Sequence, residues 1–323
     1  MTSTWFGHDA NWAQFSAGLE SGRLHHGWIL AGPRGLGKAG FAGRAAASLV
    51  DPDGKQQRLI KQRAHPDIIR VQRLPKEPPK EGEEADPSAE LKRSISIDQI
   101  RELQRSLTTR PSMGPRRAII IDAADDLERA GANALLKSLE EPPIGTYFLL
   151  ISHASDRLLP TIRSRCQMLR FEPLDDRQMH AALKQTAPNL SDNDREQLVR
   201  SGSGSPGQAL DFAGLDMAGI EQSMDLIVAK GDPDNSVRSK LAESLSLKAA
   251  QPRYEAFLRR APARIAAHAR QQPPSEVLTS VEAFHAAETL AARAIGLTLD
   301  KQAVVFQMGS LLASLQNPKQ PMN

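Results

Sequence analysis

The chain has a single cysteine, Cys166, among 323 residues, and aromatic side chains make up only 4% of it. One cysteine excludes an internal disulfide and any zinc site built from several cysteines. We interpret Cys166 as a small buried apolar side chain, with a reactive thiol as the alternative. The scarcity of aromatics, together with abundant Ala and Leu, favours helix.

Long apolar runs are also missing. The longest ones, residues 118–121 (AIII) and 147–151 (YFLLI), are far too short to cross a bilayer. The first residues, MTSTWFGHDANW, lack the charged and apolar regions of a secretory signal. We therefore expect a cytoplasmic protein without membrane contact.

Neither sign of charge is in large excess. The 41 Lys and Arg residues face 38 Asp and Glu residues, which gives a formal net charge of +3. This near balance permits a contact with nucleic acid but does not argue for one.

The first half of the chain alternates short apolar runs with helical patterns, which is typical of an α/β domain with a parallel sheet. The expected strands are 27–31, near 67–71, 116–122, 146–151 and 167–172. The expected helices between them are 38–50, 97–108 and 125–140. The stretch 73–94 is rich in Pro, Glu and Lys and predicts a solvated, mobile loop.

The strand pattern stops near residue 174. We expect a small helical domain over 176–213, interrupted by SGSGSPG at 201–207, and then helices near 237–247, 251–270, 274–295 and 300–315. The length is too great for one compact core. The prediction is therefore an α/β plus all-α chain of three domains, with boundaries at 1–173, 174–235 and 236–323.

Residues 32–40 read GPRGLGKAG, one residue short of the phosphate-binding P-loop G-x-x-x-x-G-K-[ST]. Gly32, Gly35, Gly37 and Lys38 are the candidate nucleotide-binding residues. In such a loop the glycines let backbone N–H groups wrap the phosphates, and the lysine reaches the β and γ phosphates. The next position, where a Ser or Thr hydroxyl holds magnesium, is Ala39.

A hydrolytic P-loop protein also carries an aspartate at the end of a neighbouring strand that helps to hold magnesium. Asp122 fits this role, but the next residue, where many such ATPases have a water-orienting glutamate, is Ala123. We interpret Asp125 as a helix cap rather than a substitute for that glutamate. With both groups missing, we expect very poor turnover, while weak binding of nucleotide stays open.

Several sequence blocks complete the pattern: LHHGWILAGPRGLGKA (24–39), AHPD (64–67), ANALLKSLEEPP (132–143), RSRC (163–166), GSPGQAL (204–210) and DKQAVVFQMGSLLA (300–313). Together they resemble AAA+ clamp-loader subunits, and more closely those of the delta prime type in bacterial DNA polymerase III. The resemblance is dense over 4–172 and fainter beyond. It implies a AAA+ P-loop module with a parallel sheet, a small helical lid and a C-terminal helical collar.

The resemblance also implies a function. The chain would be a non-motor (stator) subunit of a hetero-pentamer with gamma/tau-type and delta-type subunits, and so a component of a DNA polymerase holoenzyme. That assembly opens the sliding clamp and places it on primer–template DNA. The motor subunits of the family hydrolyse ATP with magnesium at subunit interfaces, whereas delta prime-like subunits generally lack competent sites of their own.

Two family features are missing from this chain. Motor subunits carry a nucleotide-sensing lid arginine at the fourth position of a G-S-x-R segment, and here Gly204-Ser205-Pro206 is followed by Gly207. Many relatives bear a four-cysteine zinc module after the P-loop helix, but residues 51–67 contain no cysteine. We expect no ATPase activity, no zinc and no cofactor of the chain's own.

Ser164-Arg165-Cys166 matches the motif whose arginine clamp-loader subunits extend into a neighbour's ATP site. A guanidinium is always charged and presents a planar fork to phosphate oxygens. Supplied in trans, such an arginine finger accelerates phosphoryl transfer by on the order of 10³–10⁵. The alternative is a surface arginine in an ion pair.

The remaining candidates have two interpretations each. Arg101 and Arg105 share one face of the 97–108 helix and either contact DNA phosphates or lie on a solvated surface. His25 and His26 are either packing residues or adenine-pocket residues. The alternative function for the whole chain is a catalytically active, motor-type AAA+ subunit. A second alternative is a small-molecule P-loop kinase, in which the helical region would have no role.

Overall fold

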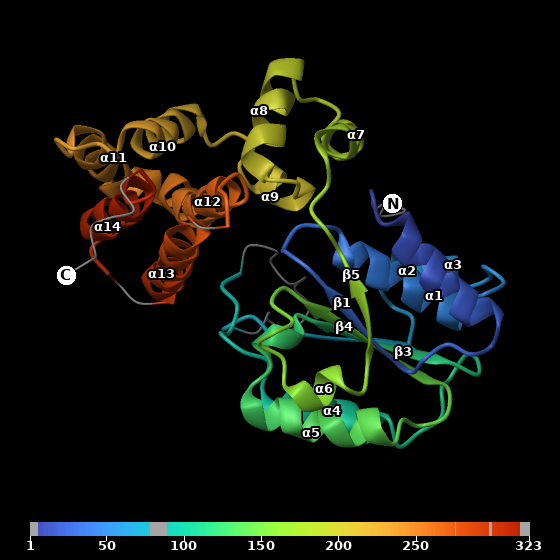
Figure 1. Ribbon diagram of the computed structural model, residues 1–323. Helices are drawn as coiled ribbons and strands as arrows, with labels where there is room; N and C mark the ends of the chain where they lie inside the picture. Colours follow the sequence, from blue (N-terminus) through green and yellow to red (C-terminus); the bar gives the residue numbers. More distant parts are fainter. Residues whose placement is uncertain (1–5, 78–88, 275, 297–298, 317–323) are drawn as a thin grey trace. The chain divides into compact units, whose positions relative to one another are not determined.

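The computed structural model describes residues 6–77, 89–274, 276–296 and 299–316 (Figure 1). The chain divides into two compact units. The first comprises Met1–Ala182 and Gly204–Gly207, and the second comprises Leu183–Ser203 and Gln208–Asn323. The three domain boundaries expected from the sequence remain predictions.

A five-stranded sheet forms the centre of the first unit, in the order β2-β3-β4-β1-β5. All neighbouring strands are parallel. The strands are β1 (Gly27–Ala31), β2 (Ile68–Gln72), β3 (Arg117–Asp122), β4 (Thr146–Ser152) and β5 (Gln167–Arg170), which confirms the five expected strands with ends shifted by one or two residues. The carboxyl ends of these strands meet at one edge of the sheet, here called the carboxyl edge, and their starts define the amino edge.

Helices cover both faces of the sheet, as Figure 1 shows. The strands are apolar on both sides, so Ile29 and Ile119 pack against α4, α5 and α6, while Leu30 and Ile120 pack against α1 and α2. The helices of this unit are α1 (Asp9–Glu20), α2 (Lys38–Val50), α3 (Gln57–Lys61), α4 (Ile97–Ser106), α5 (Arg129–Glu140) and α6 (Pro160–Arg163). Helix α7 (Asp176–Thr186) contains residue 182, where the first unit is divided from the second.

The AHPD block has a structural explanation. Asp67 is 1% exposed, and its carboxylate accepts hydrogen bonds from the N–H groups of Ser112 and Met113, at 2.7 and 2.8 Å. Arg117, buried 3.8 Å away, donates to the carbonyl of Ser106, the last residue of α4, and to that of Arg110 in the connection that follows. These charges therefore fix the path of the chain between α4 and β3.

The expected loop at 73–94 differs from the structure at its described ends, and residues 78–88 lie outside the described range. Lys76 N–H donates to the Glu90 carbonyl at 2.8 Å, and Lys92 N–H donates to the Leu74 carbonyl at 2.7 Å. The flanks therefore form a short antiparallel pairing, because backbone bonds between them need no apolar pattern in the sequence.

The described part of the second unit contains helices and no strand, which confirms the α/β plus all-α prediction. The helices are α8 (Asp192–Gly202), α9 (Pro206–Asp211, beginning in the first unit), α10 (Ala218–Lys230), α11 (Ser236–Ser246), α12 (Gln251–Ala269), α13 (Val277–Gly296) and α14 (Lys301–Ala313). The sequence did not predict α10 by its range, although its buried Ile220, Met224 and Ile227 have helical spacing. In the described residues, none of the helices combines the length and apolarity that a membrane span requires.

Candidate functional site

The P-loop lies at the carboxyl edge of the sheet, between β1 and α2. Its glycines are needed for its shape, because φ is +83° at Gly35 and +80° at Gly37. Residues with a side chain rarely adopt such values. At Gly32 an added Cβ would lie 2.2 Å from the Phe171 carbonyl oxygen. The loop therefore has the strand-to-helix geometry of a phosphate-binding turn.

Lys38 turns back onto this loop. Its side chain is buried, and its Nζ donates to the carbonyl oxygens of Gly32 and Pro33, at 2.6 and 2.5 Å. Burial lowers the pKa of Lys38 to about 8, although nearby Asp122 opposes this shift. The Lys38 ammonium is thus hydrogen-bonded to the protein itself, where a nucleotide phosphate would otherwise be its partner.

The strand-end aspartate lies near Lys38, as the P-loop pattern requires. Burial raises the pKa of Asp122, and the charges of Lys38 and Arg34 lower it in part. Ala39 is exposed and Ala123 is 4% exposed, and neither offers an oxygen to a metal or a water. The site therefore keeps one carboxylate and one ammonium of the hydrolytic set.

Asp125 has a different role from the helix cap that we expected. Its carboxylate accepts hydrogen bonds from Ser152 Oγ (2.7 Å) and from the N–H groups of His153 (2.5 Å) and Ala154 (3.3 Å). The helix α5 begins only at Arg129, with Glu128 as its N-cap residue. The helix-cap interpretation is wrong, because Asp125 holds the end of β4 instead.

Gly204–Gly207 packs against the P-loop within the first unit. Gly207 N–H donates to the Gly35 carbonyl at 2.9 Å, and Ser205 Oγ donates to the Arg34 carbonyl at 2.8 Å. A Cβ at residue 207 would lie 2.7 Å from Gly35 Cα. The structure therefore has no room for the lid arginine that this chain lacks, because the two backbones approach too closely for a side chain at residue 207.

Arg165 lies at the amino edge, opposite the P-loop. It precedes β5, which runs parallel to β1, and a Cβ at Gly27 would lie 2.9 Å from Cys166 Sγ. The P-loop follows the other end of β1, and five residues of strand span roughly 16 Å. Arg165 and the chain's own P-loop are therefore on opposite edges of the same sheet.

The guanidinium of Arg165 makes an ion pair, as the alternative interpretation expected, with a partner that the sequence did not identify. Its Nη2 lies 2.6 Å from Glu140 Oε1, and its Nη1 donates to the Thr161 carbonyl at 3.0 Å and to Ser164 Oγ at 3.3 Å. The Arg165 side chain is 35% exposed. Glu140 lies in the SLEEPP part of a block recognised from the sequence, but only the fold brings it to Arg165.

Ser164 and Cys166, on either side of Arg165, make contacts within the chain. Burial raises the pKa of the Cys166 thiol to about 12, so the thiol is protonated at neutral pH. Cys166 is partly buried and packs against the apolar core on one face of the sheet, which agrees with the packing interpretation. Ser164 Oγ donates to the Thr161 carbonyl at 3.1 Å and accepts from Arg165.

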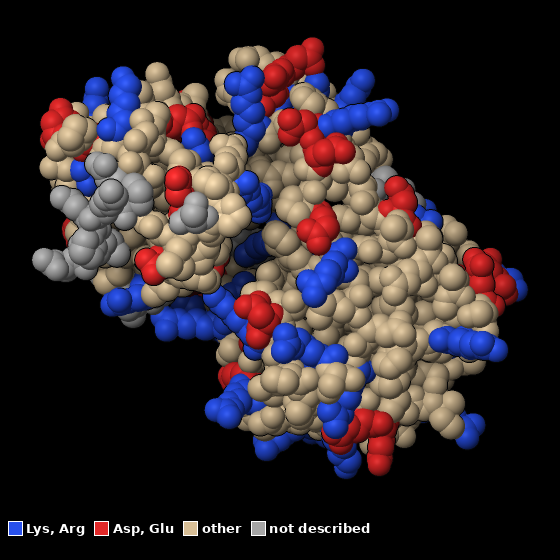
Figure 2. Space-filling view, in the orientation of Figure 1, with Lys and Arg blue, Asp and Glu red and all other residues tan. Residues whose placement is uncertain are grey.

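The exposed face of α4 carries Arg101 and Arg105. Both line a hollow of about 840 Å³ between α4 and α5, to which α5 contributes Lys137. Arg101 also pairs with Asp98 at 3.2 Å, with both side chains exposed. Lys137 was not recognised from the sequence, because the two helices come together only in the fold. Figure 2 shows basic and acidic side chains interspersed over the displayed face of the protein.

His25 and His26 lie at the start of β1, on the edge of the sheet opposite the P-loop. Their rings stack with centroids 4.4 Å apart, and His26 Nε2 is 2.9 Å from the Leu139 carbonyl. These contacts agree with the packing interpretation, and the position at the amino edge contradicts the adenine-pocket alternative.

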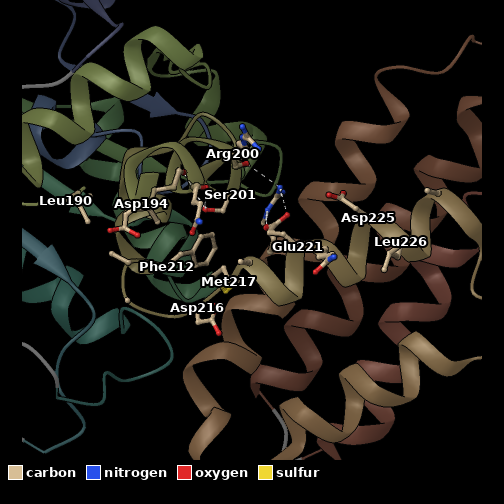
Figure 3. Close-up of a pocket in the computed structure, with 18 residues that line it drawn as sticks. Leu190, Asp194, Arg200, Ser201, Phe212, Asp216, Met217, Glu221, Asp225 and Leu226 are labelled. Atoms are coloured by element: carbon tan, nitrogen blue, oxygen red, sulfur yellow. Dashed lines mark hydrogen bonds and ion pairs between the residues drawn. The ribbon is translucent and has the colours of Figure 1, made fainter. Parts of the chain in front are cut away.

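A second hollow, of about 1020 Å³, lies within the second unit between α8, α10 and α12 (Figure 3). Arg260 on its wall is 7% exposed and donates to both Glu221 oxygens, at 2.5 and 3.1 Å, and to Ser203 Oγ at 3.0 Å. Arg260 and Glu221 on this wall therefore form a buried ion pair whose polar groups satisfy one another. No group of three or more His, Cys, Asp or Glu residues in the described ranges could hold a metal ion.

Comparison with known proteins assigns the first half of the chain. Residues 7–175 match the family model described as DNA polymerase III, delta subunit. Over 150 residues the chain is 36% identical to the DNA polymerase III subunit delta' of Pseudomonas aeruginosa, covering 44% of this chain and 41% of that protein. Over 211 residues it is 31% identical to the gamma/tau subunit of Mycobacterium tuberculosis, covering 64% and 35%. The matches thus span less than half of these two relatives, and they confirm the resemblance found in the sequence.

Among solved structures, the chain is similar to a DNA polymerase III gamma subunit-related protein from Thermotoga maritima. The TM-score is 0.45 and the identity 16%, over 94% of this chain and 100% of that one.

The contact between Gly207 and the P-loop predicts a stability effect. We expect Gly207→Ala to lower the free energy of unfolding by roughly 1–3 kcal/mol, because its Cβ would overpack against Gly35. Gly114→Ala is the matched control, since its Cβ would meet only the Val50 carbonyl at 3.7 Å. Urea unfolding of both variants checks this, and equal stability of the two would contradict the tight contact.

Proposed function

Because this chain belongs to the DNA polymerase III delta-subunit family, we propose that it is a stator subunit of the replicative sliding-clamp loader. In this role it does not hydrolyse ATP itself. It supplies Arg165 as an arginine finger to the ATP site of a neighbouring subunit, and so helps to load the clamp onto primed DNA.

The position of Arg165 carries this proposal. The residue lies at the amino edge of the sheet, while the chain's own P-loop lies at the carboxyl edge. A phosphate bound at that P-loop is out of reach of the Arg165 side chain, which is itself partly exposed. A role of this arginine in phosphoryl transfer therefore requires a nucleotide held by another subunit.

The state of the P-loop supports the absence of hydrolysis. Ala39 and Ala123 remove the magnesium hydroxyl and the water-orienting carboxylate, and Gly207 has no room for a sensing side chain. Lys38 is bonded to the loop's own carbonyl groups. A nucleotide that binds weakly here would have to displace Lys38 from these carbonyls. We assign ATP and magnesium to the neighbouring subunit, and no cofactor or zinc to this chain.

The proposed partners follow from the family. The relatives are named as delta' and gamma/tau subunits of DNA polymerase III. We infer a hetero-pentamer with gamma/tau-type and delta-type subunits, acting in the cytoplasm on the sliding clamp and on primer–template DNA. Ser164 and Cys166 support the backbone around Arg165 in this scheme.

We also propose that the basic side chains of the α4–α5 hollow contact DNA phosphates. Arg101, Arg105 and Lys137 converge on it, against Asp98 and Glu141. Such contacts contribute affinity without sequence preference, as loading at any primed site requires.

An active, motor-type subunit is the second candidate. It is favoured by the gamma/tau relatives and by the retained Lys38 and Asp122. The two candidates differ in what the isolated chain does with ATP.

The finger role predicts a loss of hydrolysis in the assembled loader. We expect Arg165→Ala to slow hydrolysis at the one site that it serves by on the order of 10³-fold or more, which removes that site's share of the total rate. Arg163→Ala, an exposed arginine on α6, is the matched control. The ATPase rate of the loader reconstituted with each variant is the measurement, and an unchanged rate with Arg165→Ala would remove this residue from the mechanism.

The isolated chain distinguishes the stator from the motor. We expect its ATP turnover with magnesium to equal that of the Lys38→Ala variant, because both lack the hydrolytic groups. A steady-state phosphate-release assay checks this. Turnover that Lys38→Ala abolishes would establish the motor-type function instead.

The DNA contacts predict a change in salt dependence. We expect Arg105→Ala and Lys137→Ala each to reduce the slope of log affinity against log salt by about 0.9, the value for one lost phosphate contact. Arg58→Ala, on α3 and thus on the other face of the sheet, is the control. Titrations of the loader with primed DNA at several salt concentrations measure the slope, and equal slopes for the three variants would place DNA elsewhere.

A further inference from the structure

Glu140 and Arg165 form an ion pair within the chain. Their charged atoms are 2.6 Å apart, and their side chains are 35% (Arg165) and 48% (Glu140) exposed. Glu140 is the last residue of α5, where a negative charge meets the negative end of the helix dipole. The position is therefore unfavourable for a glutamate within its own helix, and Arg165 supplies the compensating charge.

The guanidinium is folded back over its own segment. Besides Glu140, it contacts the Thr161 carbonyl, four residues earlier, and Ser164 Oγ. Both terminal nitrogens of the fork are thus engaged within the chain. We call this arrangement the retracted position of Arg165.

The retracted position is incompatible with stabilising a phosphate. A carboxylate at 2.6 Å offsets the positive charge that the γ-phosphate would need, and it occupies the end of the guanidinium that forms paired bonds with oxygens. A triphosphate carries more negative charge than a carboxylate, so it can replace Glu140 as the partner. Phosphate contact therefore requires Arg165 to leave Glu140.

We propose that Glu140 is a positioning residue that holds Arg165 in the retracted position until a neighbour's nucleotide displaces it. This inference rests on the proposed finger role of Arg165. Glu140 would thereby restrain hydrolysis in the loader while the neighbour's nucleotide is out of reach of Arg165. Exposed ion pairs of this kind shift an equilibrium by only about 1.5- to 5-fold, which allows the exchange to remain reversible.

The chain offers a matched control in a second helix-end glutamate. Glu20 is also exposed and is the last residue of α1, but within the described residues it has no ion-pair partner. Glu140→Gln and Glu20→Gln therefore remove the same charge from the end of a helix, and only the first removes the contact with Arg165. Thermal unfolding of the isolated variants shows whether each one folds.

The test is a double-mutant cycle in the reconstituted loader, with ATP hydrolysis measured without and with clamp and primed DNA. The part of the rate that depends on Arg165 is the rate minus that of the Arg165→Ala loader. We expect Glu140→Gln to raise this part by about 1.5- to 5-fold without clamp and DNA, and to leave it unchanged with both present at saturation. Glu20→Gln should match the unsubstituted protein in both conditions.

The double variant separates the possible failures. If Glu140 acts through Arg165, the loader with Glu140→Gln and Arg165→Ala together has the rate of Arg165→Ala alone. A rise that persists in the double variant, or no rise or a fall in Glu140→Gln, would overturn the role of Glu140 and leave the finger role standing. An Arg165→Ala loader with the full rate would instead overturn the finger role itself.

Discussion

Because the five strands are parallel, the P-loop and Arg165 lie at opposite edges of the sheet. Every strand ends at the carboxyl edge, where β1 delivers the P-loop and β3 delivers Asp122. Every strand begins at the amino edge, where Arg165 precedes β5. The rigid, doubly covered sheet holds the two edges apart, so one chain cannot bring its arginine to its own nucleotide site. In the proposed finger role, Arg165 can therefore act only on a nucleotide held by a neighbouring subunit.

Hydrogen bonds from the chain itself hold the P-loop. Lys38 bonds to the carbonyls of Gly32 and Pro33, and Gly207 and Ser205 bond to the next two carbonyls of the loop. These bonds satisfy buried polar groups that would otherwise be costly to leave unpaired. The loop geometry itself requires Gly35 and Gly37, because both have positive φ angles. The loop can thus be part of the fold whether or not it has the groups for hydrolysis.

The sequence predicted the sheet well, because strands buried on both faces are near-continuous apolar runs such as GWILA and RAIIID. It also located Arg165, Lys38 and Asp122, because short motifs mark them. It did not predict the Glu140–Arg165 pair, the contact of Gly207 with Gly35, or the bonds of Asp125 to the end of β4. Each of these joins residues 25 or more positions apart, or depends on the absence of a side chain, and local patterns carry no information about such contacts.

We propose that this chain acts on a neighbour's ATP through Arg165. A structure of the reconstituted loader with clamp, primed DNA and a non-hydrolysable ATP analogue would show this contact. We expect the Arg165 guanidinium about 3 Å from a γ-phosphate oxygen of nucleotide bound to the adjacent subunit, and no longer in contact with Glu140. An Arg165 still paired with Glu140 and remote from every bound nucleotide would contradict it.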